Sequence, residues 1–108
     1  MVIPYKLTIP ETVGAMQDLL ASMQLTSPDF THHRFPGMNI DTTFAELIAG
    51  LGNIRKVIGE NGYQVLVEMS VEMRARFDVN EVRDGNIIAY EMQEILSEVM
   101  NSKKKNKN

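Results

Sequence analysis

The segment from Tyr63 to Phe77 limits the possible folds most strongly, because its pattern fits two kinds of secondary structure. Every odd position is apolar and six of the seven even positions are polar, which is typical of a β-strand with one face in water. At helical spacing, the same segment also places four apolar residues on one stripe: Leu66, Met69, Met73 and Phe77. The fold therefore depends on which of the two patterns the chain follows.

A strand in this position would lack a good partner within the chain. Its fifteen residues far exceed the usual length of about five or six. The other alternating segment, residues 2–9, contains Pro4 and is followed by Pro10, so it fits only an edge strand or an extended arm. A helix needs no partner strand. We therefore predict a helix over residues 63–77; the alternative is an α+β fold in which this segment is a long strand paired across a dimer.

Helical spacing of apolar residues recurs elsewhere in the chain. Pro10 suits the first turn of a helix, and Thr43 and Glu46 have the spacing of a capping box. The glycines of the sequence GENG would end the second of these helices. We predict three further helices, at about residues 10–24, 43–58 and 86–101. Asp78 and Glu81 repeat the cap spacing and could start a helix earlier, with Asp84-Gly85 as either a turn or a tolerated interruption. The sequence thus predicts an all-α fold, a small bundle of three to four helices, with a short N-terminal β-strand as an option.

The length and charge of the chain indicate one domain with a basic tail. A chain of 108 residues with 44% hydrophobic residues can form one core, here assigned to residues 1–102, and would gain stability from dimerisation. Four of the eleven basic residues fall in the last six positions, so residues 1–102 keep seven basic against fourteen acidic residues, a formal charge of −7. We predict that residues 103–108 are a disordered tail, and that the acidic body favours basic partners.

The composition excludes several classes of function. The chain has no cysteine, which removes disulfides, thiolate metal sites and cysteine catalysis. It shows no signal-peptide pattern and no apolar run long enough for a membrane span, so we expect a cytoplasmic protein. Glycine patterns that hold phosphates or dinucleotides and the nucleophile-elbow motif are missing as well. We expect a protein that is not an enzyme and that uses no cofactor.

His32 and His33 are the only histidines in the sequence, so they are the only imidazole side chains that could bind a metal ion. Zinc sites usually combine more widely spaced nitrogen and sulfur ligands, and this chain has neither a third histidine nor a cysteine. Two solvent-exposed loop histidines are the simpler interpretation. We predict no metal site, and a small histidine-dependent metalloenzyme is the least favoured function.

Two groups of residues are candidates for binding another protein. Glu91, Glu94 and Glu98 share one face of the last predicted helix with no basic residue between them, which suits a basic partner, although a solvated face would look the same. Three loop residues would form an anchor if they were exposed, whereas the aromatic pair could also cover the core: Phe30, Arg34 and Phe35. We predict a non-enzymatic, self-associating interaction module, such as a regulator, adaptor or inhibitor. The alternative is a nucleic-acid-associated protein that uses the C-terminal lysines.

Overall fold

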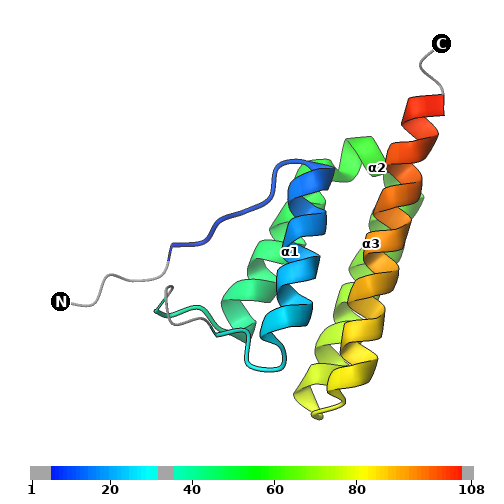
Figure 1. Cartoon of the computed structure of the whole chain (residues 1–108). Coiled ribbons are helices and arrows are strands. Elements are labelled where there is room, and N and C mark those ends of the chain that lie inside the picture. Colours follow the sequence, from blue (N-terminus) through cyan, green and yellow to red (C-terminus); the bar gives the residue numbers. More distant parts are fainter. Residues whose placement is uncertain (1–5, 32–35, 106–108) are drawn as a thin grey trace.

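The computed structural model describes residues 6–31 and 36–105, and these residues form helices and connecting segments without any strand. The helices are α1 (Val13–Thr26), α2 (Ile40–Asp78) and α3 (Val82–Lys105), which lie side by side as a bundle (Figure 1). The all-α prediction is confirmed. Residues 63–77 are helical throughout, so the alternative of a long strand at that position is wrong.

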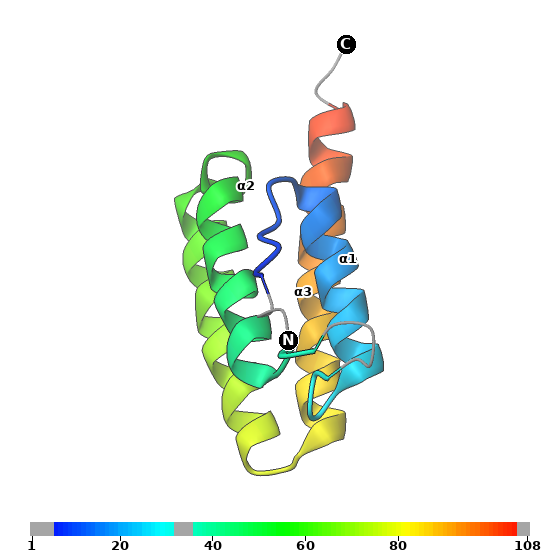
Figure 2. The ribbon, with the colours of Figure 1, turned by 90° about the vertical axis from the view of Figure 1, so that its left-hand side faces the viewer.

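The long helix α2 consists of two helical halves, residues 40–58 and 60–78, which are separated by a break at Gly59. Gly59 has φ 82° and ψ 164°, a conformation that glycine adopts without steric cost. The chain reverses at this break, and the two halves then run antiparallel (Figure 1, Figure 2). An ion pair of 2.6 Å between Arg74 Nη2 and Asp41 Oδ1 joins the far ends of the two halves. The bundle therefore has four helical segments, and the predicted stop at the glycine-rich sequence is confirmed.

The core lies between the apolar stripes of all four segments. Its side chains have at most 1% of their surface exposed and come from each helix in turn: Met16, Leu20 and Met23; Leu47, Leu51 and Ile54; Leu66 and Met73; Ala89, Met92 and Leu96. Close packing of this kind is what makes an amphipathic helix stable in a small domain. The stripe predicted within residues 63–77 therefore faces the core, as a helix requires.

The starts of α1 and α2 differ from the predicted ones, because other residues cap the helices. Thr12 Oγ1 accepts a hydrogen bond from the Ala15 N–H at 3.0 Å, so α1 begins after Thr12 and Pro10 lies outside it. At α2 the reciprocal hydrogen bonds of a capping box join Asn39 and Thr42. The capping box predicted four residues later, at Thr43 and Glu46, is therefore wrong.

Helix α3 begins four residues before the predicted start at Asn86. A short turn follows α2, in which Asn80 adopts a positive φ of 61°, and the helix starts at Val82. Gly85 lies in its first turns, and a Cβ on this residue would come 2.6 Å from the buried ring of Phe77. At the other end the helical backbone reaches Lys105, three residues into the segment that the sequence assigned to the tail.

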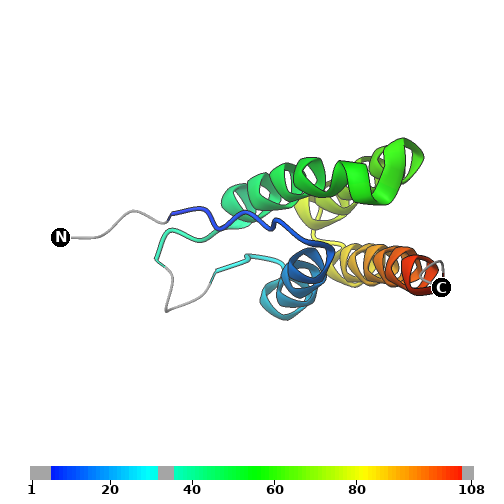
Figure 3. The ribbon, with the colours of Figure 1, turned by 90° about the horizontal axis from the view of Figure 1, so that it is seen from above.

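An extended segment, residues 6–11, completes the fold. We call it the arm; it lies between α1 and the first half of α2 in two perpendicular views (Figure 2, Figure 3). Pro10 is its buried residue, and Asn53 Nδ2 on α2 donates a hydrogen bond to the Pro10 carbonyl at 2.9 Å. Residues 6–9 form no strand, so of the two interpretations of this region the extended arm agrees with the structure.

Candidate protein-binding surface along α1 and α3

Helices α1 and α3 run antiparallel along one side of the bundle, and amide side chains join them. Gln17 Nε2 donates to Ser97 Oγ at 2.8 Å, and Gln24 Nε2 donates to Gln93 Oε1 at 2.6 Å. Gln93 Nε2 in turn donates to the backbone carbonyl of Gln17 at 3.1 Å. We call this joined surface of α1 and α3 the seam. Its hydrogen bonds hold the two helices in a fixed register, which also fixes the exposed side chains beside them.

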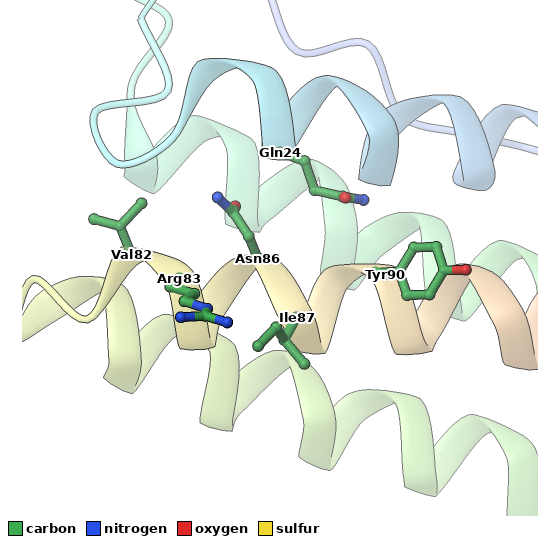
Figure 4. Close-up of a pocket in the computed structure, with 6 residues that line it drawn as sticks. All are labelled: Gln24, Val82, Arg83, Asn86, Ile87 and Tyr90. Atoms are coloured by element: carbon green, nitrogen blue, oxygen red, sulfur yellow. The ribbon is translucent and has the colours of Figure 1, made fainter.

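The end of the seam near the start of α3 is apolar and open. Val82, Ile87 and Tyr90 line a hollow there together with Gln24 of α1, and Arg83 and Asn86 of α3 complete its lining, as Figure 4 shows. Ile87 and Tyr90 have 45% and 55% of their surface exposed, so both side chains can contact a partner. Asn86 Oδ1 is buried in the same hollow, without a hydrogen-bond partner among the described residues.

The other end of the seam is acidic. Asp18 of α1 and two glutamates of α3, Glu94 and Glu98, line a second hollow over the amide bridges. Tyr90 lines both hollows, so the apolar and acidic ends form one continuous surface. A hydrogen bond to the Glu94 carboxylate, together with its negative charge, raises the pKa of the Tyr90 phenol above its usual 10.0.

Within the described residues, the carboxylates of the seam form no ion pair with an arginine. In the part of the chain that the structure describes, all ion pairs involve Arg55, Arg74 or Arg76, and their acidic partners lie on α2 or in the turn after it. Asp18, Glu94 and Glu98 take part in none of these pairs. The seam therefore carries net negative charge, whereas α2 balances most of its own.

The structure separates the residues that the sequence proposed for partner binding. Glu94 and Glu98 belong to the seam, while Glu91 is exposed on α3 without lining either hollow. Asp18, Ile87 and Tyr90 were missed by the sequence analysis. The spacing of Ile87, Tyr90 and Glu94 along α3 was a usable signal for one exposed stripe, whereas the approach of Asp18 depends on how α1 packs.

Phe30 is a core residue and does not form the exposed anchor that was one of its two predicted roles. Its side chain has no exposed surface, and its ring packs edge-on against Phe77 and Phe44 at centroid distances of 4.9 and 5.8 Å. The other anchor candidates, Arg34 and Phe35, lie outside the described residues. So do both histidines that were considered as metal ligands, His32 and His33.

Comparisons with known proteins add no functional assignment. The chain matches no protein-family model, no curated protein and no solved structure. Within residues 6–31 and 36–105, no helix has both the length and the apolar composition needed to cross a bilayer. In the same residues, no three acidic or histidine side chains gather in a way that could hold a metal ion.

Proposed function

We propose that this protein is an interaction module that binds a basic amphipathic helix of another protein along the seam. The observation that carries this proposal is the continuity of two surfaces through Tyr90: exposed apolar side chains at one end and, at the other, carboxylates that form no ion pair with any described residue. A helix with apolar residues in one half and lysine or arginine in the other would complement both ends.

Each end of the seam would contribute differently to binding. Tyr90 and Ile87 would lose exposed apolar surface under a partner, and aromatic residues of this kind commonly dominate the binding free energy of interfaces. Asp18, Glu94 and Glu98 would speed association through long-range attraction and would fix the direction of the bound helix. The negative charge of the body as a whole supports the same class of partner.

The test uses a designed helical peptide whose leucines lie towards one end and whose lysines lie towards the other. Its binding to the full-length chain is followed by fluorescence anisotropy at low and high salt. We expect the double variant Glu94→Lys/Glu98→Lys to weaken binding by about tenfold or more, because each reversed charge replaces an attraction by a repulsion. Tyr90→Ala should weaken binding at both salt concentrations, since its contribution is apolar.

The chain offers a matched control for the charge reversal. Glu68 and Glu72 are exposed glutamates on α2 with the same spacing of four residues, so Glu68→Lys/Glu72→Lys changes the net charge equally away from the seam. Because Glu72 pairs with Arg76 at 2.7 Å, thermal unfolding is used to check that this variant is folded. This control should lower affinity by less than about threefold, because exposed charges away from the interface are screened. Equal losses of peptide affinity in the two double variants would mean that only the net charge of the protein matters. That result would contradict a binding site at the seam.

A further inference from the structure

The groove between α1 and the first half of α2 holds the arm through contacts with three residues of α2. The Thr8 N–H donates to Glu46 Oε2 at 2.6 Å, and Asn53 Nδ2 donates to the Pro10 carbonyl at 2.9 Å. Gly50 lies beneath the Pro10 ring: a Cβ on this glycine would come within 3.0 Å of Pro10 Cδ. The groove thus recognises one backbone donor, one backbone acceptor two residues later, and a proline ring.

These contacts form a built site for an extended segment. Glu46 has only 3% of its surface exposed, and a carboxylate at such a position requires hydrogen-bond donors. Asn53 and Glu46 both bind main-chain atoms of the arm, which is how proteins commonly hold extended peptides. The only side chain of the arm that the groove buries is that of Pro10, so any chain carrying the same short sequence would fit it.

Exposed residues flank the one buried residue of the arm. Residues 6–9 are all exposed, and Glu11 and Thr12, which join the buried Pro10 to α1, are exposed as well. Local opening of such a segment requires much less free energy than global unfolding.

We propose that the groove also receives the arm of a second copy of this chain, so that two copies exchange arms reciprocally. The contacts of Thr8 and Pro10 would be the same in both arrangements, because each involves only the arm and α2. Exchange of identical segments is a low-cost route to a dimer for this reason. Its extent depends on protein concentration relative to the effective concentration of the arm within its own chain, which is about millimolar for short flexible connections.

The absence of cysteine from the sequence allows a direct trapping experiment with full-length chains. One chain carries Pro10→Cys and the other carries Gly50→Cys; the Cβ positions of these residues are 3.2 Å apart, slightly closer than in most disulfides. The two chains are mixed under mild oxidation, and the disulfide between the introduced cysteines is identified by non-reducing electrophoresis and peptide mass spectrometry. We expect a cross-linked heterodimer.

Ile9→Cys provides the control for random collision. Ile9 is 39% exposed, whereas Pro10 is buried, so an accidental disulfide with the Gly50→Cys chain would form faster from position 9. Docking of the arm brings position 10 against position 50. We therefore expect the cysteine at position 10 to form the disulfide at least about fivefold faster than the cysteine at position 9. A rate from position 10 that equals or falls below the rate from position 9 would overturn the proposal.

A competing peptide and a second acceptor position make the result independent of a single variant. An excess of a synthetic peptide with the sequence of residues 6–12 should lower the cross-linking rate severalfold, while the same peptide carrying Thr8→Pro, which lacks the N–H that donates to Glu46, should not. If Gly50→Cys impairs folding, Asn53→Cys replaces it, since Asn53 is exposed and contacts the same part of the arm. Cross-linking that the peptide leaves unchanged would show that the groove is not the site of capture.

Discussion

At the scale of single residues, the contact between Gly85 and Phe77 makes a sharp stability prediction. A Cβ on Gly85 would lie 2.6 Å from two ring atoms of Phe77, and that ring is packed against Phe30. We expect Gly85→Ala to lower the free energy of unfolding by about 1–3 kcal/mol, because the ring has no free space to enter. Urea denaturation followed by circular dichroism measures the change.

Gly52 is the matched control for this substitution. It also lies within a helix, but a Cβ there would meet no atom within 4 Å. Gly52→Ala should therefore raise the free energy of unfolding by about 0.5–1 kcal/mol, since alanine restricts the unfolded chain and favours the helix. Destabilisation by both substitutions would show that the contact with Phe77 is not the cause.

The pair of Tyr90 and Glu94 predicts a shifted titration at the seam. The carboxylate raises the pKa of the phenol, so the folded protein keeps this proton to higher pH than the unfolded chain does. The contribution to stability is therefore complete below the ordinary pKa of 10.0 and is lost as pH rises through the folded-state value. We expect Glu94→Ala to move the pKa of Tyr90 back down towards that ordinary value.

Ultraviolet absorbance of tyrosinate measures this pKa in a chain whose other two tyrosines, Tyr5 and Tyr63, are replaced by phenylalanine. Glu98→Ala is the control, because Glu98 lines the same hollow and is not among the causes of the Tyr90 shift. An unchanged pKa in Glu94→Ala would contradict the hydrogen bond between the phenol and the carboxylate.

At the scale of elements, the reversal of α2 depends on one residue. The φ and ψ of Gly59 lie in a region that is essentially restricted to glycine, and no neighbouring atom would block a Cβ there. We expect Gly59→Ala to cost about 1–3 kcal/mol of stability through backbone strain alone. Gly62→Ala should be neutral or slightly stabilising, because Gly62 is helical and a Cβ would make an ordinary contact with Ile58 at 3.6 Å. Thermal unfolding of both variants tests the difference.

The interiors of the helices could be predicted from sequence, whereas their starts could not. Apolar stripes continue over many residues, so the choice of helix for residues 63–77 has a cumulative physical basis. A helix start depends on one or two hydrogen bonds that several nearby residues could make. Glu46 illustrates the problem: it has capping-box spacing with Thr43, but in the fold its carboxylate binds the arm.

The candidate site was predictable only in the part that lies on one helix. The clustering of Glu94 and Glu98 follows from helical spacing, and the structure places both at the seam. The contribution of Asp18 requires α1 and α3 to meet in a particular register, which is set by contacts between residues 69 to 80 positions apart. The burial of Phe30 could not be predicted, because the sequence of a loop does not indicate whether an aromatic side chain in it is buried.

At the scale of the whole molecule, the arm and the seam use different faces of α1. The arm lies on the side towards the first half of α2, where Met16 adjoins Gly50 and Pro10. The seam lies on the side towards α3, where Gln17 and Gln24 make their hydrogen bonds. Two copies that exchanged arms would therefore keep both acidic seams open to partners.

This separation predicts that locking the arm leaves the seam unaffected. A disulfide between the introduced cysteines of a Pro10→Cys/Gly50→Cys chain should raise the free energy of unfolding by roughly 2–4 kcal/mol, since it closes a long loop in the unfolded state. Peptide affinity at the seam should stay within about twofold, because sites without shared contacts act additively. Reduction of the disulfide in the same sample supplies the control. A larger change in affinity on oxidation would mean that the position of the arm is transmitted through α1 to α3, and that arm exchange and partner binding are coupled.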